Sequence, residues 1–433
     1  MTIDTCRAGA SGGNTDRSDA IRQHVPPIPD AAALAPPLLS STLGAGLGFR
    51  PVRICLVYDC VYPHTVGGAE LWYRNLAERL AADGHEVDYL TLRQWPEGTD
   101  AGVTGVNVVV VGPRMALYAN GRRRIVPPLR FGLGVLVHLA RHGRAYEVVH
   151  TASFPYFSLL AAGALRPLRH YRLVVDWHEV WTRAYWREYL GPVAGLAGWC
   201  VQRLCTRIRQ RAFCFSHLHE RRLRMLGIRG ELTVLRGQYD GPPGCLDPAG
   251  EPPLIVYAGR HIPEKRVPAL VPALALAREQ LPDLRGLILG DGPDRPGVLG
   301  LIERHGLGEV VEAPGFVDRA RVEDALSRAL CLVLPSRREG YGLVVVEAAS
   351  HGTPSVVVAG DDNAAVELVE ESANGFVALS ASSVDLANAI LRVSEAGAAL
   401  RESTAAWFGR SRDELSLSSS LDTVTAAYRG SAP

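Results

Sequence analysis

VRICLVYD, residues 52–59, is a continuous apolar run bounded by turn residues, a pattern typical of a strand that is buried on both faces. The loop YPHTVGGAE follows at residues 62–70, and a helical pattern then extends from about Glu70 to Asp83, with Gly84 at its end. A buried strand, a loop and a helix in this order indicate the start of a parallel α/β unit.

The same alternation continues along the chain. The runs that predict further strands are VDYLTL, VNVVVV, EVVHTA, RLVVDW, AFCFS and ELTVL, and helical stretches such as 157–165 and 193–211 separate most of them. A second series begins with PLIVYAGR and continues with RGLILGDGP, EVVEAPGFV, CLVLPS and PSVVVAG. Strands that alternate with helices favour parallel sheets with right-handed crossovers. The predicted fold class is therefore α/β, with two Rossmann-like, doubly wound domains.

The segment GQYDGPPGCLDPAGEPP, residues 237–253, is dense in Gly and Pro and lacks apolar periodicity, which favours a domain boundary. We therefore expect an N-terminal domain at 50–237, a linker at 238–252 and a C-terminal domain at 253–395. Residues 396–433 are expected to form a helical tail that packs back on the N-terminal domain. Residues 1–49 have a composition typical of a disordered or loosely attached leader.

Composition and charge exclude several classes of protein. The 433 residues include 46 Lys and Arg against 45 Asp and Glu, so the net charge of +1 gives no general attraction for nucleic acid. Eight cysteines without a CxxC pair favour neither a disulfide scaffold nor a zinc ribbon. The longest apolar stretch, Phe131 to Ala140, is too short for a transmembrane segment, and the N terminus does not resemble a secretory signal. We therefore predict a cytoplasmic location.

In doubly wound domains, ligands bind beyond the carboxyl ends of the strands, so candidate residues are expected in the loops there. Gly67 and Gly68 lie in the first such loop, just before a helix. Paired glycines let backbone N–H groups approach an anion, and the helix N terminus adds positive potential. An ordinary tight turn is the alternative interpretation.

The first strand of the C-terminal domain leads directly into the segment GRHIPEKR, residues 259–266. Arg260 and Lys265 place two cations five residues apart at the end of this strand, an arrangement suited to a diphosphate. Lys265 is the only lysine among the 46 basic residues. A composition that avoids lysine elsewhere but keeps one here favours a functional role over a solvated loop.

Two carboxylates follow the predicted strand CLVLP. Glu339 lies in the loop, and Glu347 lies eight residues later on the helix that Gly342 opens. Carboxylates accept hydrogen bonds from sugar hydroxyls, and the intervening glycines expose backbone N–H donors. The valines and alanines around Glu347 predict that it is partly buried, and a buried carboxylate requires a partner.

His178 lies in the segment DWHE, just after the strand RLVV, where it can donate or accept a hydrogen bond at neutral pH. A structural loop histidine is the alternative interpretation. The order GGAE, strand-end histidine, GR-x4-K and E-x7-E resembles the retaining glycosyltransferases of family 4, which have the GT-B fold. The resemblance covers about residues 52–395. Each motif is weak alone, but the order and spacing are specific in combination.

The resemblance implies a donor site for a nucleotide sugar. Gly67 and Gly68 would contact its phosphates or sugar, and Arg260 and Lys265 would hold the diphosphate and stabilise it as it leaves. His178 would contact the sugar near the reacting carbon. Enzymes of this kind usually need no metal, so we expect neither a metal nor another cofactor.

The resemblance also assigns the sugar and the nucleoside. Glu339 would bind hydroxyls of the transferred sugar and Glu347 those of the ribose. The residues whose backbone groups would assist are Gly340, Tyr341, Gly342 and Leu343 around the sugar, and Phe316 and Val317 around the base. The Asp361-Asp362 pair could suggest a metal motif, but it precedes the helical run AAVELV, so helix capping is favoured.

The acceptor is expected in the N-terminal domain. Glu179, Trp181 and Tyr185 follow His178, and flat aromatic side chains suit sugar or cyclitol faces, although helical core packing is the alternative. Arginines spaced to line one helix face could make a weak peripheral contact with an anionic membrane, although a solvated face is the alternative. These arginines are Arg203, Arg207 and Arg211, followed by Arg221, Arg222 and Arg224.

The predicted function is the transfer of a hexosyl or N-acetylhexosaminyl group from a nucleotide sugar, with UDP favoured, to a hydroxyl of a glycan, a glycolipid or a natural product. A nucleotide-sugar epimerase of the same fold and a non-catalytic partner subunit are the alternatives. The complete motif set argues against a degenerate site. A nicotinamide dehydrogenase is disfavoured because no GxGxxG follows a strand.

Overall fold

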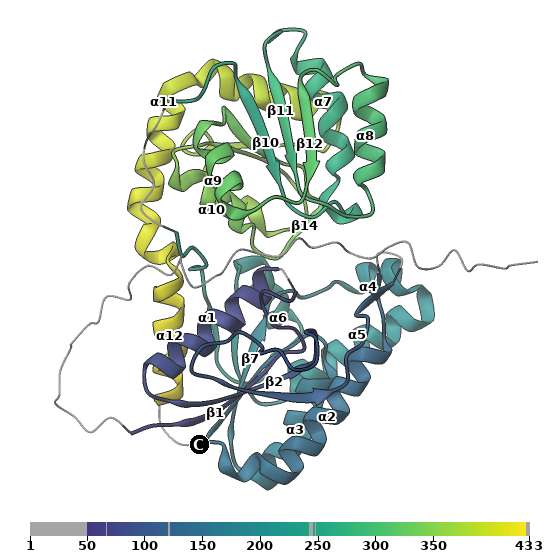
Figure 1. Cartoon of the computed structure of the whole chain (residues 1–433), viewed down its shortest axis with the longest axis vertical. Helices are drawn as coiled ribbons and strands as arrows, with labels where there is room; N and C mark the ends of the chain where they lie inside the picture. Colours follow the sequence, from purple (N-terminus) through teal and green to yellow (C-terminus); the bar gives the residue numbers. More distant parts are fainter. Residues whose placement is uncertain (1–49, 66, 120–121, 242–245, 247, 430–433) are drawn as a thin grey trace, which may run out of the picture. The chain divides into compact units, whose positions relative to one another are not determined.

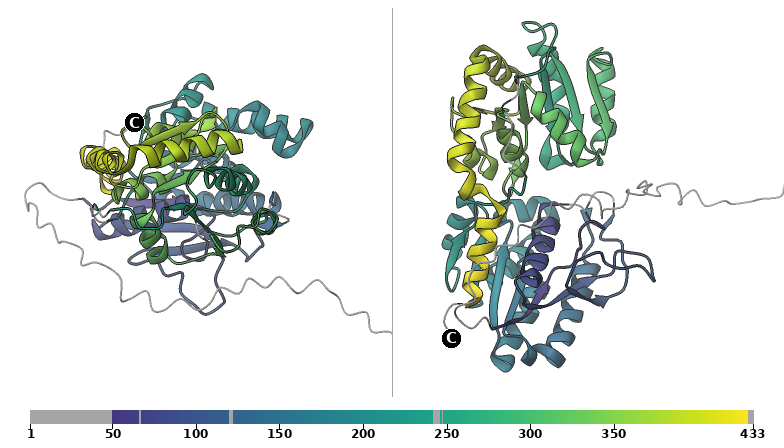
Figure 2. Two further views of the ribbon diagram at one scale, coloured as in Figure 1. Left: turned by 90° about the horizontal axis from the view of Figure 1, so that it is seen from above. Right: turned by 60° about the vertical axis from the view of Figure 1, so that its left-hand side comes forward.

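The computed structural model describes residues 50–65, 67–119, 122–241, 246 and 248–429. The leader predicted at residues 1–49 lies outside this part of the chain, as do residues 242–245 and 247 of the predicted linker. Two parallel sheets with their helices organise the described residues (Figures 1 and 2). The prediction of two doubly wound α/β domains is confirmed.

The N-terminal domain is built on a seven-stranded parallel sheet in the order β3-β2-β1-β6-β7-β8-β9. Its strands are β1 (Arg53–Val57), β2 (Glu86–Leu92), β3 (Asn107–Gly112), β6 (Val148–Ala152), β7 (Arg172–Trp177), β8 (Arg211–Cys214) and β9 (Leu232–Val234). β1 lies between β2 and β6, and its residues from Ile54 onward are fully buried. This central position explains the unbroken apolar run in the sequence, because helices cover both faces of the sheet.

Among the described residues 50–237, six helices belong to this domain. They are α1 (Gly68–Ala82), α2 (Val126–His142), α3 (Phe157–Arg169), α4 (Arg183–Leu190), α5 (Pro192–Arg207) and α6 (His217–Met225). A hairpin of β4 (Tyr118–Ala119) and β5 (Arg122–Arg123) precedes α2, and the 3-10 turn η2 (Gly143–Ala145) follows it. Within the described part of the chain, none of the helices is long and apolar enough to traverse a bilayer.

The helix predicted at residues 193–211 ends earlier, at Arg207. Ile208 takes an extended backbone, and the Gln210 side chain donates to the carbonyls of Cys205 and Ile208, which turns the chain into β8. Arg211 therefore lies on a strand, where it pairs with Glu231. The prediction that Arg203, Arg207 and Arg211 line one helix face is wrong.

The C-terminal domain is built on a six-stranded parallel sheet in the order β12-β11-β10-β13-β15-β17. Its strands are β10 (Leu254–Ala258), β11 (Arg285–Leu289), β12 (Val311–Gly315), β13 (Cys331–Leu334), β15 (Ser355–Val358) and β17 (Gly375–Ala378). Its helices are α7 (Leu270–Ala277), α8 (Arg295–Arg304), α9 (Arg319–Arg328), α10 (Leu343–Ser350) and α11 (Ser383–Leu415), with 3-10 turns η3 (Pro263–Lys265), η4 (Val267–Ala269) and η5 (Ala364–Leu368).

The C-terminal helices connect the two domains. α11 packs on the C-terminal core through residues such as Leu386 and Ile390, whereas α12 (Leu417–Arg429) contributes Val424 and Tyr428 to the N-terminal core. The segment around Tyr239 runs beside the junction of α11 and α12, because Leu417 N–H donates to the Tyr239 carbonyl over 2.8 Å. Two chain segments therefore join the domains, and they are hydrogen-bonded to each other.

Candidate active site

The proposed donor residues gather at the carboxyl ends of β10 and β13, two adjacent strands at which the winding direction of the sheet reverses. Such a switch point is the usual ligand site of a doubly wound sheet. Lys265 Nζ donates to Glu339 Oε1, and Ser336 Oγ donates to the same oxygen over 2.8 Å. Arg260 is exposed, and its guanidinium forms no hydrogen bond or ion pair with other described residues. One cation of the pair is therefore held by a carboxylate, and the other is open to an anion.

Glu339 lies on a short strand rather than in the loop that the sequence predicted. β14 (Arg338–Glu339) pairs in parallel with β16 (Asp362–Asn363). Gly342 then takes a left-handed backbone conformation, with φ of 101°, and α10 begins at Leu343. This turn presents the backbone of Gly340 to Leu343 at the start of α10, next to the carboxylate of Glu339.

Glu347 is half-buried on α10, as predicted, and its carboxylate accepts no hydrogen bond from the described residues. Burial raises its pKa to about 7. The nearby positive charge of Arg319 offsets part of this rise. Arg319 also pairs with Asp240 and Glu323, and the negative charges of these two residues raise the pKa of Glu347 further. A half-buried carboxylate without a partner is an acceptor that a hydroxyl-bearing ligand can satisfy.

Phe316 and Val317, the two residues predicted to meet the base, follow β12. The Phe316 side chain is 71% exposed, whereas Val317 packs partly into the C-terminal core. A large aromatic ring that remains exposed suits a flat ligand. The structure thus places Phe316 on the surface, and its predicted contact with a base stays a prediction.

His178 and the loop that carries it meet the C-terminal domain. A Cβ at Gly340 would lie 2.9 Å from the His178 carbonyl oxygen, so only a glycine allows this approach. The His178 ring stacks on Phe215 with 4.6 Å between ring centroids, and its Nε2 is shielded from solvent without a hydrogen-bond partner among the described residues. Burial lowers the pKa of His178 to about 4, against the opposing effect of Asp176. His178 is therefore neutral at physiological pH.

A buried network beneath His178 was missed in the sequence. Asp176 accepts a hydrogen bond from Trp72 Nε1 over 2.7 Å, and its other oxygen lies 2.9 Å from His150 Nε2. Although burial raises the pKa of Asp176, the interactions with His150, His178 and Trp72 lower it below its ordinary value. His150 also contacts the hydroxyl of Tyr428 on α12. The network thus ties α1, β6, β7 and the C-terminal helix together below the site.

Arg338 joins the two domains, and its role was also missed. Its guanidinium carbon lies 4.0 Å from the ring centroid of Tyr185 and 4.4 Å from that of Trp181, and the group pairs with Glu179. These three residues were predicted to face the acceptor. In the structure they bind Arg338, so a role in acceptor binding would require this contact to open. In the sequence, this role was indicated by the position of a charged residue directly before Glu339.

The Gly67-Gly68 turn lies at the start of α1, as predicted. A Cβ at Gly67 would lie 2.4 Å from Glu70 Oε2, so the Glu70 side chain folds back over the turn. A Cβ at Gly68 would meet no atom within 4 Å. The atoms that a Cβ at Gly67 would meet belong to the end of the flexible Glu70 side chain, which can move, so packing requires a glycine at neither position and phosphate binding there stays a prediction.

The aspartates at 361 and 362 do not cap a helix. Asn363 is the capping residue of η5, with its side chain accepting from Ala365 N–H, and Asp362 pairs with Arg222 over 2.5 Å. The helix-capping prediction is therefore wrong. No group of three His, Cys, Asp or Glu side chains suited to a metal was found in the described ranges.

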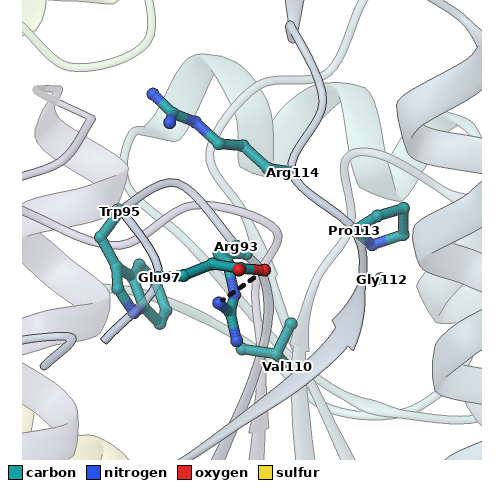
Figure 3. A pocket seen from close by; sticks show the side chains of 7 residues that line it. All are labelled: Arg93, Trp95, Glu97, Val110, Gly112, Pro113 and Arg114. Atoms are coloured by element: carbon teal, nitrogen blue, oxygen red, sulfur yellow. Dashed lines mark ion pairs between the residues drawn. The ribbon is translucent and has the colours of Figure 1, made fainter. Parts of the chain in front are cut away.

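A cavity of about 440 Å³ opens at the carboxyl ends of β2 and β3 in the N-terminal domain (Figure 3). Arg93 and Glu97 form an ion pair of 3.6 Å, Trp95 lies beside this pair, and Arg114 lies above it with its guanidinium turned away from the pair. Gln94 connects this rim to the loop before α1, because its Oε1 accepts from Val61 N–H over 2.8 Å. The cavity was not predicted from the sequence.

The two parallel-sheet domains have the fold of GT-B glycosyltransferases. The family described as "Glycosyltransferase Family 4" matches residues 66–237, and the family described as "Glycosyl transferases group 1" matches residues 246–406. The chain belongs to the glycosyltransferases of family-4 type, and the predicted enzyme class is confirmed.

Curated relatives match different parts of the chain. The α-D-kanosaminyltransferase of Streptomyces kanamyceticus is 33% identical over 33% of this chain and 36% of its own length. The glycogen synthase of Mycobacterium tuberculosis is 26% identical over 70% of this chain and 77% of its own length. The D-inositol 3-phosphate glycosyltransferase of Jonesia denitrificans is 35% identical over 30% of this chain and 32% of its own length. Two of these matches span only about a third of the relative.

Solved structures show the same fold. Sucrose-phosphate synthase from Thermosynechococcus elongatus has a TM-score of 0.70 at 21% identity, covering 87% of this chain and 98% of its own. HepE from Anabaena, solved in complex with UDP and glucose, has a TM-score of 0.63 at 17% identity, covering 87% of this chain and 99% of its own.

Proposed function

We propose that this glycosyltransferase moves a hexosyl or N-acetylhexosaminyl group from a UDP-sugar to a hydroxyl group, with retention at the anomeric carbon and without a metal ion. The observation that carries the proposal is the grouping of Arg260, Lys265 and Glu339 at the carboxyl ends of β10 and β13. The cytoplasmic location expected from the sequence stays part of this proposal.

In the proposed complex, the diphosphate lies between Arg260 and Lys265. The Arg260 guanidinium is already free of partners among the described residues, and Lys265 shares its charge between Glu339 and the incoming phosphate. Glu339 keeps the hydrogen bond that it accepts from Ser336 and accepts further hydrogen bonds from hydroxyls of the sugar. Two cations next to a diphosphate supply the charge that a divalent metal would supply, which supports a metal-independent reaction.

The proposed reaction exchanges one bond at the anomeric carbon for another. The bond to the diphosphate oxygen breaks, and the bond to the acceptor oxygen forms on the same face of the sugar. The acceptor's hydroxyl proton passes to the departing diphosphate, whose developing charge Arg260 and Lys265 stabilise. His178 is neutral, so it can hold a sugar hydroxyl through a hydrogen bond but adds no charge.

The choice of UDP rests on a likeness of fold. HepE was solved with UDP and glucose, and it shares the two-domain architecture. In this chain, the unpartnered carboxylate of Glu347 is suited to the two hydroxyls of a ribose, and the exposed ring of Phe316 is suited to a base. Neither group distinguishes uracil from another base, so the donor screen must include several nucleotides.

For the acceptor, we propose the cavity between Arg93 and Arg114 and an acceptor that carries an anionic group such as phosphate. Arg93 is paired only with the highly exposed Glu97, and Arg114 forms no ion pair with described residues. Two arginines that line the same open cavity favour an anion. The inositol phosphate in the names of several relatives supports a phosphorylated acceptor.

The proposal is tested by incubating the protein with UDP-, GDP- and ADP-sugars and a panel of phosphorylated and neutral acceptors. We expect release of nucleoside diphosphate from one donor, dependent on acceptor and resistant to a metal chelator, and an NMR spectrum that shows the donor's anomeric configuration in the product. Arg260→Ala should abolish release, whereas Arg304→Ala, an exposed arginine on α8, should not.

Two outcomes would support the alternatives instead. Conversion of the nucleotide sugar into its epimer without an acceptor would identify an epimerase. A folded protein that releases no nucleoside diphosphate from any donor would support a non-catalytic partner subunit.

A further inference from the structure

Helix α2 carries a row of apolar side chains that nothing in the described structure covers. Val126, Leu129, Leu133 and Val137 recur at intervals of three or four residues, which places them on one side of the helix. Leu129 is 46% exposed and Leu133 is 61% exposed, and Ile125 extends the row at the start of the helix. We call these five residues the α2 row.

The other side of α2 is fully used in packing. Phe131, Val135 and Leu139 are buried in the N-terminal core. A Cβ at Gly134 would lie 2.1 Å from the carbonyl oxygen of Val111 on β3, so the helix backbone lies directly against the sheet. Because the helix is fixed by this side, it cannot turn to bury the α2 row. The apolar row is a stable feature of the surface.

The stretch of sequence that contains the α2 row has one sign of charge. Residues 101–146 contain seven arginines and no aspartate or glutamate. Four of these, the exposed Arg124, Arg130, Arg141 and Arg144, form no side-chain hydrogen bond or ion pair with the described residues.

The two exposed arginines of α9 show the contrasting arrangement. Arg319 and Arg328 each pair with a carboxylate four positions away on the same helix, and such pairs neutralise part of a helix's charge. Arg304 on α8 has no such pair among the described residues, but its helix carries the carboxylate of Glu303. The lack of carboxylates along α2 therefore leaves its positive charge uncompensated.

We propose that the α2 row and its arginines dock this protein on an anionic membrane surface. A helix with an exposed apolar row and arginines beside it lies in the interface plane, with the apolar side chains among the acyl chains and the guanidinium groups at the phosphates. A second copy of this chain is disfavoured, because a two-fold interface would bring unpaired arginines together. Nucleic acid is disfavoured, because its backbone offers no surface for leucine side chains.

Docking through the α2 row would also hold the cavity lined by Arg114 close to the membrane surface. α2 follows β3 in the chain, and the cavity lined by Arg114 lies at the end of β3. The start of α2 and the cavity are therefore joined by a short stretch of chain at the same edge of the sheet. An acceptor presented by a membrane could reach the cavity, although docking itself requires no glycosyl transfer.

The test measures binding of the full chain to vesicles by sedimentation. We expect binding to phosphatidylglycerol vesicles at ~50 mM salt, much weaker binding at ~300 mM salt, and none to phosphatidylcholine vesicles. Leu129→Gln with Leu133→Gln should lower the partition coefficient on the order of a hundredfold, and Arg130→Gln with Arg141→Gln about thirtyfold. The matched control is Leu299→Gln with Arg304→Gln on α8, also exposed, which should bind as the wild type does.

Three results would overturn the proposal. The wild type could fail to bind anionic vesicles at low salt, or the α2 variants could bind as tightly as the control. Alternatively, analytical ultracentrifugation could show a wild-type dimer that the leucine variants dissociate, in which case a second copy covers the row. Because all substituted side chains are exposed, the thermal midpoints of the variants should equal that of the wild type, which separates lost docking from lost folding.

Discussion

Replacement of Glu347 by Gln is expected to stabilise the free protein and to weaken donor binding. Burial raises the pKa of Glu347 from its ordinary 4.5 to about 7, Arg319 offsets part of this, and Asp240 and Glu323 add to it. The folded state therefore holds this proton more tightly than the unfolded chain does. The resulting stability is present below about pH 4.5 and is lost as the pH rises through about 7.

The size of the effect follows from the two pKa values. A tenfold change in proton affinity corresponds to about 1.4 kcal/mol, so the complete difference would be about 3.4 kcal/mol, and partial solvent access to Glu347 reduces it to about 1–3 kcal/mol. Glu347→Gln should therefore raise the Tm near pH 8 by about 2–4 °C for each kcal/mol, with little change near pH 5. The exposed Glu303 on α8 provides the control, since Glu303→Gln should have no such effect.

Donor affinity should change in the opposite direction. If only the ionised carboxylate accepts the ribose hydroxyls, the apparent Kd of UDP-glucose should rise about twofold at pH 7 and about tenfold at pH 6, relative to pH 8. The diphosphate of a nucleotide sugar is esterified at both ends and keeps its charge over this range, so calorimetry reports the protein group. In Glu347→Gln the affinity should be about 10–100-fold lower and independent of pH. A variant that is less stable near pH 8, or that binds UDP-glucose with the wild-type pH dependence, would refute the reasoning.

Three further predictions concern the residues around the site. Arg338→Ala should lower the free energy of unfolding by about 2–3 kcal/mol in chemical denaturation, because it removes an ion pair and two cation–π contacts. The control Arg337→Ala breaks an exposed pair and should lower the free energy of unfolding by less than about 1 kcal/mol. Equal losses in the two variants would disprove the bridging role of Arg338. Lys265→Ala should reduce kcat by about 10²–10³, measured as nucleoside diphosphate release, and unchanged turnover would exclude Lys265 from leaving-group stabilisation. The ring protons of His178 should not shift between pH 6 and 8 in an NMR titration, because its pKa is about 4, and a midpoint within that range would contradict its neutral role.

The parallel sheets could be predicted from the sequence because their strands are buried on both faces. Ile54 to Val57 in β1 and Val356 to Val358 in β15 are apolar without alternation, and their burial leaves no other arrangement for such runs. The position of Glu347 on a helix followed similarly from Gly342, whose left-handed backbone marks the start of α10.

Contacts between distant segments could not be predicted in this way. Arg338 is 159 positions from Glu179, and Asp176 is 104 positions from Trp72. The local sequence pattern predicts the helix or strand on which each residue lies. It does not predict which distant helix or strand packs against that residue. The end of α5 was misplaced for a related reason, because the buried side chain of Gln210 turns the chain at a point where the helical pattern of arginines continues.

Calorimetric titration with UDP, GDP, ADP and dTDP, and then with their common sugar conjugates, tests most directly whether the C-terminal domain holds a nucleotide sugar. Wild type, Lys265→Ala and Arg304→Ala should be compared in the same buffer. Our account predicts tight binding of one nucleotide family, a large loss of affinity in Lys265→Ala and no loss in Arg304→Ala. Absence of binding by the folded wild type, or equal binding by Lys265→Ala, would contradict it.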